Sequence, residues 1–348
     1  MINIKQIPHH KCRNYSLDVI RIIACLMVIL MHSPSPNPNP SSVVYGGISY
    51  LTSPCIGLFF MVSGANLLPS KLPLFSFLKK RIEKIIWPTL IWTIIYLLLK
   101  NILTEPSNSL LKELLSIPFS PQGHGVLWFM YTLIGIYLVT PIISPWLERA
   151  QNREIGFIVC LWIITLLYPF FTSKLIVRDD TTGTLYYFSG YIGYYIMGYY
   201  LQRIHFRINW LWLFCLYIVC ILIFIIKKMR NWDFWDDGLF WYLGIFTAAM
   251  ALTIYQFFCV NISSKINDVI ERHNICRKIV ISISTLSFGI YLIHIAIMRY
   301  ILWNQAWFLS ISNCVVETLI CFLITFFVSY LIIYIISKFR FSKYIIGI

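Results

Sequence analysis

Ten long apolar segments constrain the fold of this 348-residue chain more than any other feature of its sequence. A helix needs about 20 apolar residues to cross the hydrocarbon core of a bilayer. Segments of this kind lie at Tyr15–Ser33, Val44–Leu68, Ile85–Leu103, Val126–Leu147, Ile155–Phe171, Leu185–Leu201, Ile208–Ile226, Gly238–Val260, Ile279–Leu302 and Cys314–Ser337. Because lipid cannot pair with the open edges of strands, we expect each segment to be helical. The sequence therefore predicts an all-α, polytopic membrane protein with about ten transmembrane helices.

The composition excludes the main soluble classes. Hydrophobic residues make up 59% of the chain and charged residues only 12%, against about 25% charged in a soluble domain. Disorder would require low hydrophobicity. The net charge is +14, but the basic residues lie on no polar domain of the kind that binds nucleic acid. The ten cysteines form no C-x-x-C pair. We therefore expect neither a metal nor a nucleic-acid partner.

The distribution of Lys and Arg predicts the orientation, because cytoplasmic loops carry an excess of both residues. Of the 28, nineteen fall on the N-terminal side of the predicted membrane and seven on the other side. We expect both termini to be cytoplasmic, with basic tails at residues 1–14 and 339–348 around a ten-helix domain at residues 15–338. No small-residue cleavage site follows the first apolar segment, so it is expected to be a retained span.

Apart from Lys100, which is counted with the outer side, four charged residues lie inside the predicted spans, where charges are costly and default to functional candidates. They are Asp18, Arg21, Arg299 and Glu317. Arg21 and His32 are eleven residues apart, which on a helix places them on one face, about 16 Å apart along its axis. Asp18 precedes Arg21 by three residues and can pair with it. This set is either a structural ion pair with an interfacial histidine or part of an active site.

The ninth predicted span carries a second polar stripe. Ser284, Ser287, Tyr291 and His294 follow one another at helical spacing and share one face. The serines either line a site or hydrogen-bond to neighbouring helices, as membrane serines often do. We expect His294 to line a cavity and to face His32.

Other residues are assigned by their position in the spans. Ser63 and Gly64 are expected to permit close helix packing, and the tyrosine-rich sixth span is expected to serve packing more than a site. Arg299 and Glu317 lie near the outer ends of the last two spans, so we expect them to pair. Trp128, near the outer end of the fourth span, contacts a substrate or belongs to the interfacial aromatic belt.

A series of motifs resembles those of membrane acyltransferase family 3, in the order of that family. The spacing R-x10-H of Arg21 and His32 is similar to the signature of its first span. The segments that resemble later motifs are Gly57–Leu68 (F-F-x-x-S-G), Phe77–Pro88 (R-x-x-R), Val126–Ile143 (L-W-F), Tyr191–Leu201 and Ser284–His294. Lys84 stands where the family often has the second Arg of R-x-x-R. Val126 stands where relatives often have His, and a histidine occurs two positions earlier, as His124. An extracytoplasmic domain that some relatives add is not expected.

The resemblance implies an O-acyltransferase of the bacterial cytoplasmic membrane. Such an enzyme moves an acyl group, usually acetyl, from cytoplasmic acyl-CoA to a hydroxyl of a cell-surface glycan or its lipid-linked precursor on the outer side. The implied catalytic residues are Asp18, Arg21, His32 and His294, with His32 a general base or an acylated nucleophile. The implied donor-binding residues are Arg21, Lys79, Lys80, Arg81, Lys84, Ser284, Ser287 and Tyr291. The residues assigned to the acceptor are His124, Trp128, Trp232, Asp233, Trp235, Arg299 and Glu317.

Two alternatives remain open at this point. The cluster Lys79, Lys80, Arg81 and Lys84 suits the phosphates of CoA, but it is also typical of a topology signal that contacts anionic lipid. A transporter or flippase of a lipid-linked glycan is the alternative function. Transporters often contain internal repeats and broken helices at the midplane, and the two halves of this sequence show no clear repeat.

Overall fold

The computed structural model describes residues 13–35, 42–103, 109–121, 125–174, 181–230 and 237–348, and these residues form helices and no strands. The α-helices are α1 (Tyr15–His32), α2 (Ser42–Thr52), α3 (Pro54–Leu67), α4 (Leu74–Arg81), α5 (Trp87–Leu103), α6 (Leu110–Ser116), α7 (Trp128–Arg149), α8 (Asn152–Thr165), α9 (Tyr168–Lys174), α10 (Ile192–Ile204), α11 (Trp210–Arg230), α12 (Ile245–Gln256), α13 (Ser263–Arg272), α14 (Asn274–Ile295), α15 (Ala306–Leu309), α16 (Cys314–Ile336) and α17 (Ser342–Ile345). The π-helices are η1 (Ile82–Ile86), η5 (Phe257–Asn261) and η6 (Ala296–Ile301), and the 3-10 helices are η2 (Gly125–Leu127), η3 (Tyr186–Phe188), η4 (Asp237–Phe240) and η7 (Leu302–Asn304).

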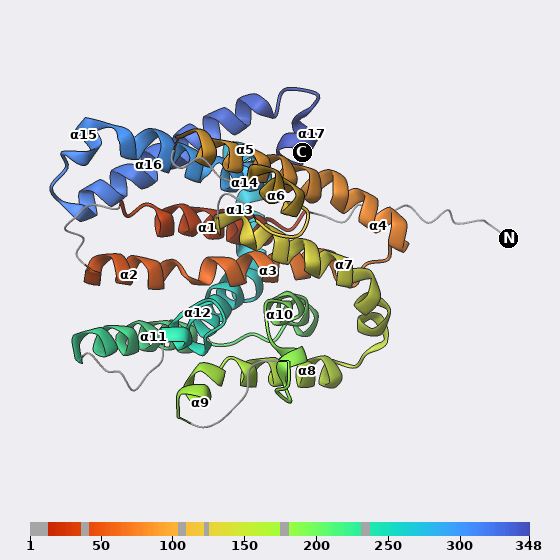
Figure 1. Cartoon of the computed structure of the whole chain (residues 1–348). Helices are drawn as coiled ribbons and strands as arrows, with labels where there is room; N and C mark the ends of the chain where they lie inside the picture. The colour runs from red at the N-terminus through yellow and green to blue at the C-terminus, as the bar shows by residue number, and fades with distance from the viewer. Residues whose placement is uncertain (1–12, 36–41, 104–108, 122–124, 175–180, 231–236) are drawn as a thin grey trace.

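Nine helical stretches in the described residues are long and apolar enough to cross a membrane, so the predicted all-helical membrane fold is confirmed. Each of the nine overlaps one predicted span. The sixth of the ten predicted spans, Leu185–Leu201, has no counterpart among the nine, because its helix, α10, has only 13 residues. At 1.5 Å per residue α10 is about 20 Å long, less than the roughly 30 Å of the hydrocarbon core. It lies between α3 and α8 (Figure 1). The side on which each terminus lies stays a prediction.

Helix α1 lies inside the bundle, packed against α2, α3, α13, α14 and α16 (Figure 1). It begins after Asn14, whose side chain accepts a hydrogen bond from the amide of Ser16 and so caps the helix. Helix α13 fixes this end of α1: the amide of Tyr15 donates to Oδ1 of Asn267 at 2.8 Å, and the Ser16 hydroxyl donates to that of Ser263 at 2.9 Å. These bonds fix the register of α1 relative to its neighbours.

Helices α3 and α10 approach so closely that only glycine fits at their contact. A Cβ atom on Gly64 would lie 1.8 Å from the backbone oxygen of Tyr195, and one on Gly198 would lie 2.0 Å from that of Met61. The prediction of close packing is confirmed for Gly64, whereas Ser63, which was given the same role, lines a cavity described below. The tyrosines Tyr194 and Tyr195 of α10 are buried in the core, as expected for a packing role.

The outside of the bundle is apolar. Large exposed side chains include Ile142 of α7, Phe157 of α8, Trp212 of α11 and Phe327 of α16, each more than 60% exposed. Soluble monomers rarely expose large apolar patches, whereas lipid is the natural solvent of such a surface. This arrangement fits a protein embedded in a membrane.

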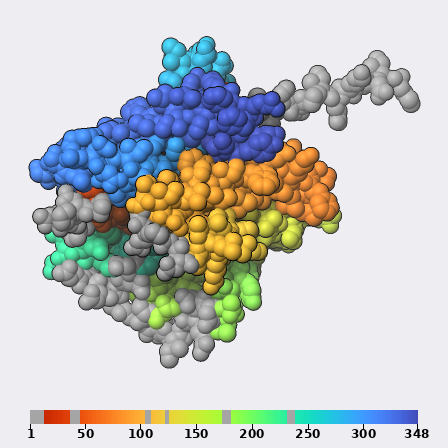
Figure 2. All heavy atoms as spheres, turned by 45° about the horizontal axis from the view of Figure 1, so that its top comes forward, coloured from red at the N-terminus to blue at the C-terminus, as the bar shows by residue number. Residues whose placement is uncertain are grey.

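The last residues of the chain fold back onto the bundle. Helix α17, in the segment assigned to the C-terminal tail, packs against α5, and the indole nitrogen of Trp92 donates to the backbone oxygen of Ile345 at 3.0 Å. Ile346 is fully buried. Figure 2 shows this blue C-terminal region beside the orange helices α4 and α5. Residues 342–348 therefore pack as part of the bundle.

Candidate active site

A network of charged and polar side chains lies where the first half of α1 packs against α14. Asp18 is 5% exposed and accepts hydrogen bonds from Nε of Arg13 at 2.5 Å, the Ser284 hydroxyl at 2.6 Å and Nη1 of Arg21 at 3.3 Å. The same Nη1 also donates to the Ser284 hydroxyl at 3.1 Å. The Asp18–Arg21 pair expected from the sequence is therefore present. Nε and Nη2 of Arg21 have no protein partner among the described residues.

His32 and His294 lie together at the other end of α1, with ring centroids 5.4 Å apart, so the expected facing pair is present. The expectation that His294 lines a cavity is not met in the three cavities described below, because His294 is fully buried and only His32 reaches a cavity. Nδ1 of His32 is 2.8 Å from the backbone oxygen of Val28, and Nδ1 of His294 is 2.5 Å from that of Tyr291. A carbonyl oxygen only accepts hydrogen bonds, so each Nδ1 carries the proton in the neutral ring. Nε2 of His32 is then the basic nitrogen, which is the form a general base requires.

Tyr96 of α5 holds the backbone of α14 beside His294. Its hydroxyl donates to the backbone oxygen of Leu292 at 2.7 Å and accepts from the amide of Ala296 at 3.2 Å. In a regular α-helix those two backbone groups would bond to each other. The helix changes here from α14 to the π-helix η6, a feature that frequently marks functional sites. Tyr96 thus stabilises the irregular turn that carries His294.

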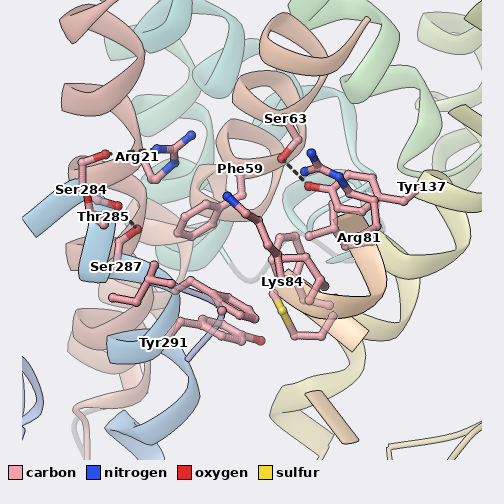
Figure 3. A pocket seen from close by; sticks show the side chains of 17 residues that line it. Arg21, Phe59, Ser63, Arg81, Lys84, Tyr137, Ser284, Thr285, Ser287 and Tyr291 are labelled. Atoms are coloured by element: carbon pink, nitrogen blue, oxygen red, sulfur yellow. Dashed lines mark hydrogen bonds between the residues drawn. The ribbon is translucent and has the colours of Figure 1, made fainter. Parts of the chain in front are cut away.

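A cavity of about 300 Å³, which we call the Arg81 cavity, adjoins the Arg21 network. Figure 3 shows Arg21 and the α14 serines Ser284 and Ser287 on one side, Arg81 on the other and Lys84 between them. Phe59, Phe129, Met130, Leu133 and Tyr137 supply apolar and aromatic surface to its lining.

Arg81 is a cation of this cavity whose guanidinium is held between two aromatic rings. Its guanidinium lies 5.3 Å from the ring centroid of Phe77 and 5.6 Å from that of Tyr137, which restricts its movement. Its buried Nε has no hydrogen-bond partner among the described residues. The Arg81 cavity therefore suits a ligand with an anionic group and a long uncharged arm.

A second cavity, of about 560 Å³, opens toward the surface at the other end of α1. We call it the His32 cavity. His32 and Arg299 line it, together with the aromatic residues Trp128, Tyr191, Trp241 and Tyr242. Tyr242 is fixed by a hydrogen bond from its hydroxyl to the sulfur of Met31 at 3.0 Å. Aromatic faces beside a basic imidazole suit a substrate with flat or ring-shaped apolar faces and a reactive hydroxyl.

A third cavity, of about 660 Å³, is also lined by Arg21, and we call it the Arg203 cavity. Arg13, Asp18, Asn66 and Arg203 are among its lining residues. Arg203 donates to the backbone oxygens of Leu147 and Ala150, at 3.0 and 2.8 Å, and so caps the end of α7. Arg21 lines both this cavity and the Arg81 cavity.

Several residues that the sequence assigns to the donor or the acceptor do not line these three cavities or lie outside the described residues. Lys79 and Lys80 are exposed on α4 and line none of these three cavities.

The expected pairing of Arg299 with Glu317 is wrong. Glu317 is fully buried and accepts a short hydrogen bond from Ser35, whereas Arg299 lies over the ring of Trp303, 5.6 Å from its centroid. The two side chains contact different neighbours. The residue spacing within one helix does not determine how that helix is rotated about its axis relative to a second helix, so the sequence could not establish this pair. His124, Trp232, Asp233 and Trp235 lie outside the described residues.

Sequence reasoning missed some residues that build the site. The sequence pattern places Arg13 in the tail, but its charge two residues before the first span is a visible signal of a role beside Asp18. Tyr96 and Phe129 gave no signal, because their roles depend on contacts between distant helices. Gly347 lines the Arg81 cavity; it has a φ of +73°, and a Cβ there would lie 2.1 Å from the backbone oxygen of Lys84.

Comparison with known proteins identifies the family of this chain. Residues 14–337 match the family described as acyltransferase domain, the family of membrane acyltransferases to which the motifs point. No curated protein and no solved structure matches the chain. Because the match covers nearly the whole chain, this protein belongs to membrane acyltransferase family 3 and is a multi-pass membrane acyltransferase.

Proposed function

We propose that this acyltransferase moves an acetyl group from cytoplasmic acetyl-CoA to a hydroxyl of a cell-surface glycan, or its lipid-linked precursor, on the outer side of a bacterial cytoplasmic membrane. The observation that carries the proposal is the arrangement along α1. A cationic cavity adjoins Arg21 at one end, and the paired imidazoles of His32 and His294 stand at the other. The family supplies the reaction class, and this arrangement supplies a donor end and an acceptor end.

The Arg81 cavity is the proposed donor site. Arg21, Arg81 and Lys84 give it three cationic groups, and CoA is a polyphosphate with a thin, uncharged pantetheine arm. Planar guanidinium groups bind phosphate oxygens through paired hydrogen bonds. The exposed Lys79 and Lys80 on α4 extend the positive charge beyond the cavity, where they would attract the nucleotide by long-range electrostatics.

His32 is the proposed base. Its Nε2 takes the proton of the acceptor hydroxyl while the hydroxyl oxygen attacks the thioester carbon. The new C–O bond forms as the C–S bond breaks, and the protonated imidazole returns the proton to the CoA sulfur. An alternative route acylates His32 first and then transfers the group to the acceptor. His294 stands within contact of His32 in both routes.

The His32 cavity is the proposed acceptor site. Trp128, Trp241 and Tyr242 present aromatic faces, which are suited to the apolar faces of sugar rings. Arg299 adds hydrogen-bond donors at the rim of the same cavity. These contacts support a glycan better than a small apolar acceptor.

A transfer assay tests this proposal. Purified protein in lipid nanodiscs is incubated with labelled acetyl-CoA and a lipid-linked glycan, and label on the glycan is measured. We expect transfer by the wild type and a loss of roughly a hundredfold or more in His32→Ala, since general bases contribute factors of this size. His273→Ala is the matched control, because His273 is exposed at the start of α14, in a loop away from the three cavities. Full activity of His32→Ala would contradict the assignment.

A further inference from the structure

The proposed donor and acceptor cavities meet at a boundary that carries aromatic side chains, which we call the partition. No described residue lines both the Arg81 cavity and the His32 cavity. Consecutive residues at the start of α7 face different cavities: Trp128 lines the His32 cavity and Phe129 lines the Arg81 cavity. The two cavities therefore have separate linings that meet at the start of α7.

Tyr291 completes this partition from α14. Its ring lines the Arg81 cavity, and its hydroxyl donates a short hydrogen bond to the backbone oxygen of Val126, which lines the His32 cavity. Its ring lies 5.7 Å from that of Phe129 in an edge-to-face arrangement. The hydrogen bond thus joins α14 to the start of α7 across the boundary between the two cavities.

The partition lies directly beside the reacting groups. Tyr291 is 5% exposed, and its ring centroid is 5.5 Å from that of His294, which contacts His32. Tyr291 and Phe129 lie at the boundary of the two cavities, so a thioester that advances there from Arg21 toward His32 meets these two side chains. Passage requires the Tyr291 hydroxyl to leave Val126 or the ring of Phe129 to move.

A closed partition solves a chemical problem of the proposed reaction. The His32 cavity opens toward the surface, and a base that deprotonates a sugar hydroxyl also deprotonates water. In hydrolysis, water forms a C–O bond to the thioester carbon, the C–S bond breaks, and the products are a carboxylate, a proton and the CoA thiol. A thioester exposed to His32 without an acceptor would be lost in this way.

We propose that Tyr291, through its bond to Val126, determines the reaction specificity of the enzyme by favouring transfer to the acceptor over hydrolysis. This inference rests on the proposed function. The family resemblance implies donor binding for Tyr291, and this proposal adds a separate role at the boundary with the acceptor cavity.

Tyr291→Phe tests the role of the hydroxyl, because it removes the bond to Val126 and keeps the ring. The release of CoA thiol from acetyl-CoA is measured without acceptor, and transfer is measured with it. We expect hydrolysis without acceptor to rise roughly two- to tenfold, the range of one neutral hydrogen bond, when both rates are measured at saturating acetyl-CoA. Tyr131→Phe is the matched control: Tyr131 lies on α7, donates to the backbone oxygen of Ile117 at 2.7 Å and lines neither cavity. It should hydrolyse at the wild-type rate.

Phe129→Leu opens the same partition from α7 and is the second variant, so the test does not depend on one substitution. It should also raise hydrolysis. The inference is overturned if both variants bind CoA and transfer the acyl group but hydrolyse no faster than the wild type. It is equally overturned if Tyr291→Phe binds CoA but loses transfer and hydrolysis together, since the hydroxyl would then serve the chemistry. A wild type that binds acetyl-CoA but neither transfers nor hydrolyses would instead contradict the proposed function.

Discussion

At the scale of single residues, Ser284 connects Asp18 and Arg21 at the proposed donor end. Its hydroxyl donates to Asp18 and accepts from Arg21, so one oxygen orients a carboxylate and a guanidinium at once. Asp18 also holds Arg13. Ser284 is thus a positioning residue, and its loss should act on the donor through Arg21.

Asp18→Asn should raise the KM for the acyl-CoA donor about tenfold or more, because it removes a charged partner of Arg21, and hydrogen bonds to charged groups contribute about 1.5–3 kcal/mol. Ser284→Ala should raise it less, about fivefold. The measurement is steady-state kinetics with the donor varied. Ser282→Ala is the control, since Ser282 bonds instead to the hydroxyl of Tyr330 at 2.8 Å. An equal effect of Ser282→Ala would show that the KM reports only general damage to α14.

Tyr96→Phe should lower kcat about fivefold, the effect of one neutral hydrogen bond of about 1 kcal/mol, without changing the donor KM. The lost hydroxyl frees the backbone at Leu292 and Ala296, and His294 would move relative to His32. Tyr255→Phe is the matched control, because Tyr255 is equally buried and donates to the backbone oxygen of Gly198 at 3.2 Å. Equal losses of kcat in the two variants would contradict a role for Tyr96 in the site.

Residue-level prediction from sequence succeeded where a single helix fixes the geometry. The spacing of Arg21 and His32 on α1, and of Ser284 and His294 on α14, follows from the helical repeat alone. Tyr96 could not be predicted, since it meets Leu292 across 196 positions of sequence. Contacts of that kind depend on how helices pack, which no repeat within one helix determines.

At the scale of elements, the contact of α3 with α10 supports the framework around the site. The backbones meet at Gly64 and Gly198, so the two helices pack by close van der Waals contact, the usual basis of helix association in membranes. The sequence predicts the small residues of α3. It could not show that their partner, α10, is a helix of only 13 residues, because the apolar run continues through residues that form η3 and a turn.

Gly64→Ala should destabilise the protein by about 1–3 kcal/mol, the usual cost of overpacking, because the added carbon would overlap the backbone oxygen of Tyr195. Thermal unfolding in detergent measures the change as a lower Tm. Gly135→Ala on α7 is the matched control: a Cβ there meets nothing within 4 Å, so the better helix propensity of alanine should leave the Tm unchanged or raise it. A Tm of Gly64→Ala equal to that of the wild type would contradict the close approach.

At the scale of the whole molecule, the predicted cytoplasmic side and the positions of the cavities can both be described along α1. The surplus of +14 falls in loops and tails that the distribution of Lys and Arg assigns to the cytoplasm, which is where the anionic donor would arrive. The Arg81 cavity, with Arg21, lies toward the start of α1, and the His32 cavity lies at its end. The central claim is therefore that the acyl group crosses the membrane within the protein, from a donor on one side to an acceptor on the other.

Sidedness of transfer tests this claim most directly. Proteoliposomes are prepared with the lipid-linked glycan confined to the lumen and with labelled acetyl-CoA, which does not cross lipid, added outside. Vesicles in which the C-terminus faces outward are selected by an affinity tag. We predict label on the luminal glycan, and its absence in His32→Ala. Label that appears only when donor and glycan share one side of the membrane would contradict the account.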